Sequence, residues 1–436
     1  MQVNASYSPD VLERMVYAGV QASSFREAST HLQKLAGLKI DRKQIERWTR
    51  RIGGARIAER DRQVEQWANL PLPMMTSGSP PGKAPNTVMV SMDGGRLQIL
   101  DQDQEAKADG TSETLVQEAL RDEADEITTE PLCEEDRENK SSYWRESKIG
   151  CLVTFQSQTY EADPCPGIPE NFLEPPRILK LSREICRNAP QDSLPSDAAN
   201  LRTDREEAEL VAGRPEMLVK TVVATKAPYV TFGPLLAAAA WARGFSAAKR
   251  KAFVADGAKI NWTIWRRHFS HYTPILDFIH VISRVFAAAM AGRDFKEGWP
   301  AYVRWANWLW SGRVAELLVE VERRRNELGP PEKTDSATSP RRVVSDALTY
   351  LTNNQAYLDY ARYRQEGLPI TSSLMESTVK QVSRRVKGTE KFWSSEGAEP
   401  ILQLRGDYIS DTDPLLKFWE PWQRQASGQR SYSHAA

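Results

Sequence analysis

The sequence predicts an α/β protein with a mixed β-sheet core and a helical insertion, preceded by an all-α unit. Short runs of β-branched and apolar residues alternate with helical patterns in the middle of the chain, as is typical of an α/β core. The 436 residues are too many for one simple core, so we expect two or three domains. The predicted strands are residues 87–90, 144–156, 218–225 and 249–256, with a further short strand over 96–100.

The first unit carries a succession of helix start signals. Ser8 is a cap followed by a proline, and residues 24–27 (SFRE) form a capping box. Asp41 opens a third helix in the same way. A separate helix is expected to follow over residues 58–67.

The third helix of this unit is basic. Residues 39–56 contain seven basic and two acidic side chains, a net charge of +5. Three short helices with a basic last helix suit a helix-turn-helix module that contacts DNA phosphates. The alternative is a small helical bundle with a solvated basic face. The side chains expected to contact DNA are Lys43, Gln44, Arg47, Arg50 and Arg51.

The zero net charge of the chain conceals an uneven distribution. Residues 101–140 hold fifteen Asp and Glu against four Lys and Arg, so this acidic insert carries −11 and the remainder +11. Its low hydrophobicity predicts a mobile segment outside the core. The basic remainder indicates a polyanionic partner.

Two predicted strands each lead into an aspartate followed by glycine. Asp93 follows the first strand, and Asp256 follows the strand over residues 249–256. Parallel or adjacent strands of this kind can bring two carboxylates within reach of one divalent ion, and Mg²⁺ or Mn²⁺ prefers such oxygen ligands. A plain turn is the alternative at each position.

Asp277 and His280 share one face at the start of the next predicted helix. Such a pair can be a structural hydrogen bond. It can also orient Asp256 or contact DNA.

A third acid, Glu376, lies one turn into a helix that Thr371 or Ser372 is expected to cap. Residues 380–391 contain five basic side chains and one acid. A glutamate in a basic helix is usually a surface ion-pair partner. Here the same face continues through cations, as in a helix that lies along a phosphate backbone: Lys380, Arg384 and Lys387.

Residues 281–365 are predicted to be helical, with their aromatic side chains in a core.

The cysteines and the absence of long apolar runs bear on the location of the protein. The four cysteines show no CxxC spacing, so we expect reduced thiols and no zinc site. No apolar run of 18 residues and no secretory signal is present, which favours a cytoplasmic location without membrane contact.

Taken together and in this order, the motifs resemble those of bacterial insertion-sequence transposases of the DDE type. The similarity is to the Kra-type elements and the wider Mutator-like group, over residues 85–410. It rests on SMDGG at Asp93, FVADGAK at Asp256, ILDFIH at Asp277 and His280, GLPITSSLMESTVK at Glu376, and FWSSEGAEPILQLR over 392–405.

The resemblance implies an RNase H-like core with a helical insertion, matched here by residues 281–365. It also implies a supporting aspartate–histidine pair, matched by Asp277 and His280. Finally, it implies two divalent ions, Mg²⁺ or Mn²⁺, held by Asp93, Asp256 and Glu376.

The expected function is cutting of element ends and their joining to target DNA by two-metal phosphoryl transfer. The expected partners are double-stranded DNA, as element ends and as target, and further copies of the chain in a homo-oligomer. The expected location is the bacterial cytoplasm, in association with the nucleoid. One alternative is a DNA-binding regulator, or an inactive element-derived protein, that uses only the helix-turn-helix. Another is a nuclease that does not transpose.

The expected domain organisation follows from these assignments. Residues 1–69 form the helix-turn-helix domain, and 70–85, rich in Pro, Ser and Gly, form a linker. Residues 86–280 and 366–410 form the catalytic core, interrupted by the acidic insert and by the helical insertion over 281–365. Residues 411–436 are expected to be a C-terminal tail.

Overall fold

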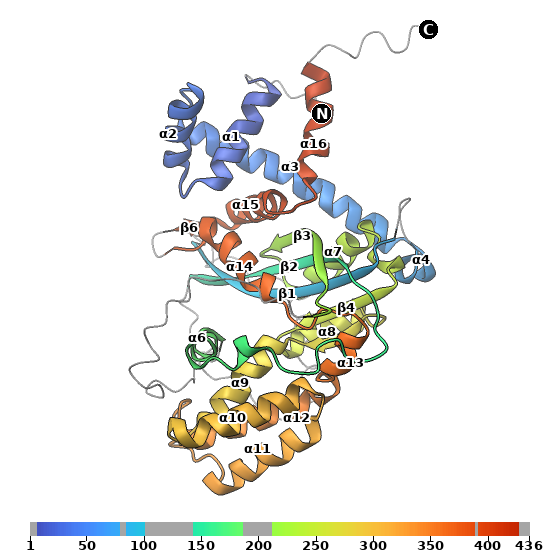
Figure 1. Cartoon of the computed structure of the whole chain (residues 1–436). Coiled ribbons are helices and arrows are strands. Elements are labelled where there is room, and N and C mark those ends of the chain that lie inside the picture. The colour runs from blue at the N-terminus through green and yellow to red at the C-terminus, as the bar shows by residue number, and fades with distance from the viewer. Residues whose placement is uncertain (1–6, 79–83, 101–142, 186–211, 389–390, 427–436) are drawn as a thin grey trace, which may run out of the picture.

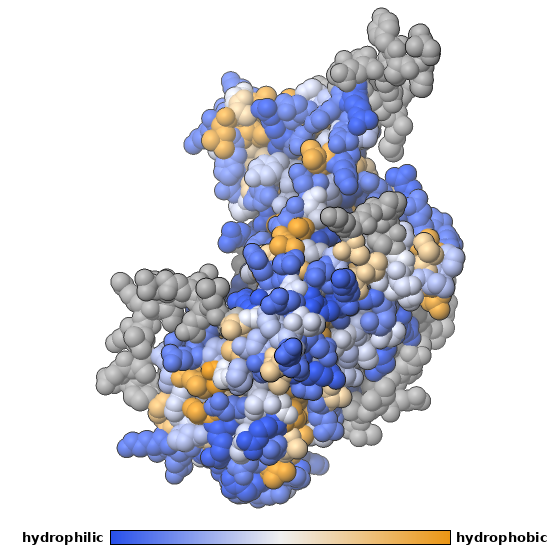
Figure 2. All heavy atoms as spheres, turned by 45° about the vertical axis from the view of Figure 1, so that its right-hand side comes forward, coloured by the Kyte–Doolittle hydropathy of each residue, from blue (hydrophilic) through white to orange (hydrophobic). Residues whose placement is uncertain are grey.

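The computed structural model describes residues 7–78, 84–100, 143–185, 212–388 and 391–426. The acidic insert expected over residues 101–140 lies outside the described residues. Figure 1 shows the sheet in the middle, the N-terminal helices on one side of it and the helical insertion on the other. Among the described helices, none combines the length and the apolar character that crossing a membrane requires. On the face seen in Figure 2, hydrophilic residues predominate and apolar residues form small separate groups.

The centre of the molecule is a mixed sheet in the order β3-β2-β1-β4-β5, with β6 paired to β1. The β1–β2 and β2–β3 pairs are antiparallel, and the β1–β4 and β4–β5 pairs are parallel. The expected α/β class with a mixed sheet is therefore confirmed. The strands are β1 (Thr87–Ile99), β2 (Trp144–Gln156), β3 (Glu216–Thr225), β4 (Arg250–Ala255), β5 (Thr273–Leu276) and β6 (Phe392–Trp393).

The separate strand expected over residues 96–100 is wrong, because β1 runs without a break to Ile99. Gly94 and Gly95 stay in the ladder, opposite Lys148 and Ser147 of β2. A Cβ on Gly95 would lie 2.7 Å from the Ser147 hydroxyl, so glycine is needed for this close pairing.

Both edges of the sheet are capped by other parts of the chain. At the β3 edge, the Asp411 amide donates to the Lys220 carbonyl, and the Lys220 amide donates to the Asp411 carboxylate, both at 2.8 Å. The Val222 amide donates to the Ser410 hydroxyl. At the β5 edge, Tyr360 and Tyr363 of α13 (Tyr360–Gln365) donate their hydroxyls to the Leu276 and Pro274 carbonyls.

Helices cover the two faces of the sheet. α7 (Tyr229–Ala242) packs on one face, where a Cβ on Gly150 of β2 would meet Leu236 at 2.4 Å. α14 (Ser373–Val386) packs on the other face, against β1 and β2. The connecting elements are α4 (Leu72–Thr76), η2 (Glu170–Phe172), α6 (Pro175–Ile185), η4 (Phe245–Ala247) and α8 (Lys259–His268).

The helical insertion is built on aromatic residues, as expected. Tyr302, Trp305 and Trp310 of α10 are buried, and the Tyr302 hydroxyl donates to the Phe172 carbonyl at 2.6 Å. The helices of this region are α9 (Phe278–Met290), α10 (Phe295–Trp310), α11 (Val314–Leu328) and α12 (Pro340–Asn353), with the short turn η5 (Gln355–Tyr357) before α13.

The N-terminal helices α1 (Pro9–Gln21), α2 (Phe25–Ala36) and α3 (Arg42–Ala68) follow the predicted caps at Ser8, Ser24 and Asp41. The separate helix expected over residues 58–67 is wrong, because α3 is continuous to Ala68. Burial explains this continuity. The middle of α3 lies against α15 (Ser395–Tyr408), and tertiary contact outweighs the low helix propensity of two adjacent glycines.

Part of the segment expected to be a C-terminal tail forms a helix. Residues Pro414–Ala426 form α16, and Leu415 and Trp419 of this helix are buried with the core of α1–α3. The first and last described helices thus share one apolar cluster.

The linker region also makes specific contacts. The Trp241 indole donates to the Met74 carbonyl, and the Ser246 hydroxyl donates to the Met75 carbonyl.

Candidate active site

Asp93 and Asp256 belong to neighbouring parallel strands in different ways. Asp256 directly follows the end of β4, as expected. The expectation that Asp93 follows the first strand is wrong, because β1 continues through it to Ile99. The last printed pair of the β1–β4 register is Ser91 with Val254, so two residues further on Asp93 is level with Asp256. Neighbouring strands lie about 5 Å apart, and residues at one level of a parallel pair point to one face. The strand-acid-glycine pattern therefore brings these two carboxylates to the same edge of the β1–β4 pair.

Local hydrogen bonds hold both aspartates. The Gly94 amide donates to Asp93 Oδ1 at 2.6 Å. Asp256 Oδ1 accepts from the Ala258 amide at 2.9 Å and from the Asn261 side chain at 2.7 Å. Gly257 adopts a φ of +93°, and a Cβ there would meet a tyrosine ring at 2.8 Å, so the turn after Asp256 requires glycine.

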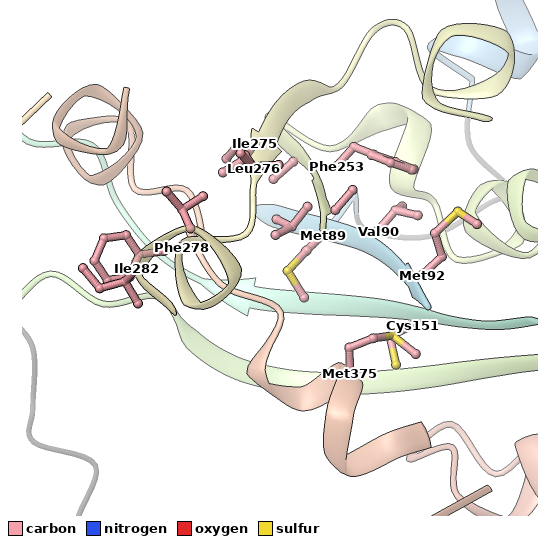
Figure 3. Packing of buried hydrophobic residues seen from close by; sticks show 14 of the residues in the cluster. Met89, Val90, Met92, Cys151, Phe253, Ile275, Leu276, Phe278, Ile282 and Met375 are labelled. Carbon is pink, nitrogen blue, oxygen red and sulfur yellow. The ribbon is translucent and has the colours of Figure 1, made fainter. Parts of the chain in front are cut away.

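Helix α14 brings Glu376 to the face on which Asp93 lies. Ser91 Oγ is 3.7 Å from Met375 Sδ, and a Cβ on Gly95 would lie 3.5 Å from the Ser383 hydroxyl. Ser91, Asp93 and Gly95 alternate along β1, so all three face α14. Figure 3 shows Met375 beside Cys151 of β2 under the sheet, and Glu376 is the next residue of the helix.

Asp277 joins the start of α9 to the start of α14. Its carboxylate accepts from the Ile279 amide at 2.9 Å and from both the amide and the hydroxyl of Ser372. His280 Nδ1 lies 3.4 Å from Asp277 Oδ2. Ser372 is the cap residue expected for α14, but its hydroxyl bonds to Asp277 and not to the helix. The pair is thus a structural link that fixes the helix carrying Glu376.

The three acids share one electrostatic environment. Burial raises the pKa of Asp93 to about 6, and the charges of Asp256 and Glu376 add to the increase. The Gly94 amide and the charge of His280 act in the opposite direction. With these neighbours, the ionised form of Asp93 is unfavourable by itself, and a bound cation would stabilise it.

The other groups fit the same arrangement. Burial raises the pKa of Glu376, against the charges of Lys380 and His280. Burial alone would lower the pKa of His280, but the hydrogen bond and charge of Asp277 raise it overall. Burial would raise the pKa of Asp277, yet its bonds to His280 and Ser372 lower it. Asp277 is therefore held as a carboxylate beside a more basic imidazole.

The donor chemistry of the site suits a hard divalent ion. Asp93, Asp256 and Glu376 supply carboxylate oxygens, which Mg²⁺ and Mn²⁺ prefer. Within the described ranges, no three or more His, Cys, Asp or Glu side chains lie close enough together to hold a metal as they stand. The observation that fits a metal is the half-buried Asp93, whose pKa is raised by burial and by the charges of Asp256 and Glu376.

The candidate DNA contacts differ in exposure. On α3, Lys43, Arg47 and Arg51 are exposed, whereas Gln44 and Arg50 are half-buried. Arg50 is paired with a glutamate of its own helix at 2.7 Å. On α14, Lys380, Arg384 and Lys387 are all exposed, and Lys380 Nζ lies 3.9 Å from Glu376.

Sequence reasoning missed a polar group beside Gly94, on the α7 face of the sheet. Tyr229 donates its hydroxyl to Glu146 at 2.6 Å, and Lys148 Nζ lies 3.4 Å from the same carboxylate and 4.9 Å above the Tyr229 ring. Lys148 is buried and pairs with Gly94 in the ladder. A lysine two residues after a glutamate in a predicted strand was the available signal, but Tyr229, which contacts both, comes from a distant segment.

Comparison with protein families finds no matching family model, and comparison with curated proteins finds no significant similarity.

Proposed function

We propose that the chain is a metal-dependent DNA strand-transferring enzyme, a transposase of the DDE type with an RNase H-like core. One observation carries the proposal. Asp93 is on β1, Asp256 directly follows the adjacent parallel strand β4, and Glu376 comes from the helix over the same face. Burial and the charges of both other acids raise the pKa of Asp93 to about 6. Three converging acids from distant parts of a chain are typical of metal-dependent phosphoryl transfer.

In the proposed reaction, Asp93, Asp256 and Glu376 hold two Mg²⁺ or Mn²⁺ ions. When bound, the ions supply an activated water and neutralise charge on the leaving oxygen. Water would attack the phosphodiester at the element end and break its P–O3′ bond. The freed 3′-hydroxyl would then attack a target phosphodiester in a second in-line step and displace the 3′-oxygen of the target strand. No covalent bond to the protein forms in either step.

The chain's own residues position the acids. Asp277 fixes the start of α14 through Ser372, so it orients Glu376 without contacting DNA itself. A protonated His280 offsets part of the negative charge among the acids. Phosphates are bound by the exposed cations of α14 and of α3, the helix proposed as the DNA reader of a helix-turn-helix module.

The proposal is tested by DNA cleavage with single substitutions. Asp93→Asn, Asp256→Asn and Glu376→Gln should each abolish cutting of duplexes carrying the DNA that flanks the gene. Binding to the same duplexes should change little, since these side chains contribute to chemistry and not to phosphate contact. The assay is run with Mg²⁺, Mn²⁺ and chelator, and the exposed Glu322→Gln, which changes an acid far from the site, is the matched control.

The outcomes separate the proposal from its rivals. Cutting without joining to a second duplex indicates a nuclease. Binding without cutting in any metal indicates a regulator that uses the N-terminal helices only. Cleavage at the parental level by one of the three variants removes that residue from the site.

A further inference from the structure

Near the C-terminal end of α14, the Arg385 side chain contacts the N-terminal helices. This side chain is 4% exposed. Its Nε donates to the Gly19 carbonyl at 3.0 Å and its Nη1 to the Ser23 carbonyl at 3.3 Å. The guanidinium is clamped between the rings of Phe25 and Trp393, at 4.8 and 4.9 Å from their centroids.

The surroundings of Arg385 are costly for a cation. Within the described part of the chain no carboxylate forms an ion pair with it, its Nη2 is buried without a hydrogen-bond partner, and burial lowers its pKa to about 10. The carbonyl end of α1, whose last turn has no basic residue, compensates only in part. An apolar side chain would fill this space at lower cost, so packing alone does not explain an arginine here.

A second arginine strengthens the same junction. Arg405 of α15 is 6% exposed, and its Nε and Nη2 donate to the Gln381 carbonyl of α14 at 3.0 and 2.9 Å. Its Nη1 donates to the Gln21 side chain of α1. Helix α14 is therefore attached to α1 at two adjacent points.

Glu376 lies between two anchors of one rigid helix. At the start of α14, Ser372 is bonded to Asp277. Nine residues after Glu376, Arg385 is bonded to α1 and to the turn that follows it. Nine residues of helix span about 13 Å, and a helix of this length transmits a displacement with little bending.

The basic helix α3 reaches the same junction through a tight contact. A Cβ on Gly19 would lie 2.4 Å from Thr49 Oγ1 and 3.1 Å from Ile45, both on α3. The exposed Lys43 and Arg47 are near neighbours of Ile45 in that helix. A shift of α3 against α1 must therefore move Gly19, whose carbonyl Arg385 binds.

We propose that Arg385 is a positioning residue, through which DNA bound to α1–α3 sets the placement of Glu376 in the active site. The proposal rests on the proposed function, since it requires that α3 binds DNA and that Glu376 acts in cleavage. It assigns Arg385 no contact with DNA or metal.

The test is amide hydrogen exchange of the full chain, with and without a random-sequence DNA duplex. All proteins tested also carry Lys380→Gln, Arg384→Gln and Lys387→Gln, so that DNA does not protect α14 by direct contact. In this parent background, DNA should slow exchange in α3 and also in α14. In Arg385→Met, which keeps the aliphatic stem and loses the donors, DNA should slow exchange in α3 only. Arg26→Met, at an exposed arginine of the neighbouring α2, is the matched control and should behave as the parent does.

Cleavage kinetics give the second readout. Arg385→Met should lower kcat by about 5- to 150-fold, the usual range of coupling between sites, while KM for DNA stays within about twofold. If Arg385→Met does not fold, Arg385→Lys takes its place, and DNA should slow exchange in α14 less than in the parent.

The outcomes distinguish the two proposals. Slowed exchange in α3 with no effect on α14 of the parent, or with an equal effect in Arg385→Met, overturns the coupling and leaves the proposed function standing. No DNA effect on α3 at all overturns the DNA-reading role of α3, and the coupling with it.

Discussion

At the residue scale, Asp93 is the most informative side chain of the candidate site. It is a carboxyl group on a central strand, with two further acids close enough to raise its pKa. Nothing in packing requires an acid at this position. The arrangement costs stability in the metal-free chain, which is common where a structure is built for binding and not for stability alone.

This cost gives a pH-dependent prediction. A raised pKa means that Asp93 favours the fold fully below its ordinary value of 3.8, and that this contribution is lost as the pH rises through about 6. The variant Asp93→Asn is neutral at every pH. Without metal it should be more stable than the parent above pH 6, by on the order of 1–3 kcal/mol, and equally stable below 3.8.

Urea denaturation in chelator at a series of pH values measures this difference. Adding Mn²⁺ should reverse the order at neutral pH, because only the parent retains the full set of ligands. Equal stability of the two proteins at neutral pH without metal would show that Asp93 is not crowded by negative charge.

Local pattern identified the acids but not their partners. A strand followed by acid and glycine pointed to Asp93 and Asp256, and the parallel pairing of β1 with β4 brings the two residues together, although only Asp256 lies at a strand end. The link from Asp277 to Ser372 joins residues 95 positions apart, and no local signal encodes it. The burial of Arg385 was equally invisible, since in sequence it is one of several cations in a basic helix.

At the element scale, α3 and α15 show how glycine placement fixes helix packing. A Cβ on Gly53 would lie 2.6 to 2.8 Å from side-chain and backbone atoms of Pro400, whereas a Cβ on Gly54 would meet nothing within 4 Å. From the sequence, a separate helix is expected after these glycines, over residues 58–67. In the structure, Gly53 permits close contact with α15, and Gly54 faces solvent.

The two neighbouring glycines form a matched pair for a stability test. Gly53→Ala should destabilise the chain by about 1–3 kcal/mol, because the new methyl group forces α3 away from backbone that cannot yield. Gly54→Ala should be neutral or stabilise by up to about 1 kcal/mol, since alanine is the better helix former. Thermal and urea denaturation followed by tryptophan fluorescence give both values. Equal effects of the two substitutions would rule out the tight α3–α15 contact.

At the scale of the whole molecule, the two ends of the chain form one unit on the sheet. Arg56 Nε and Asp407 Oδ2 lie 3.0 Å apart although 351 positions separate them, and both side chains are at least nine-tenths buried. Helix α16 adds Leu415 and Trp419 to the cluster of α1–α3. The docking of both ends depends on contacts that only the folded chain creates.

Breaking this ion pair should be costlier than replacing it. Asp407→Leu leaves the buried Arg56 with only the more exposed Glu59 as an ion-pair partner and should destabilise the chain by up to about 3–5 kcal/mol. The double variant Arg56→Met, Asp407→Leu should recover most of that loss, because no buried charge remains at this position. Urea denaturation of the parent, the single and the double variant measures both. A single variant that costs less than the double one would contradict a buried pair at this junction.

The capping of both sheet edges bears on how copies of this chain can assemble. Backbone groups at Lys220 and Val222 are occupied by Asp411 and Ser410, and the carbonyls of Pro274 and Leu276 by tyrosine hydroxyls. A strand from another molecule would find few free donors or acceptors at these positions, which also protects the chain from fibril-like stacking. Any multimer that brings two DNA ends together must then be built from helical or loop surfaces, and not by extending the sheet across a subunit boundary.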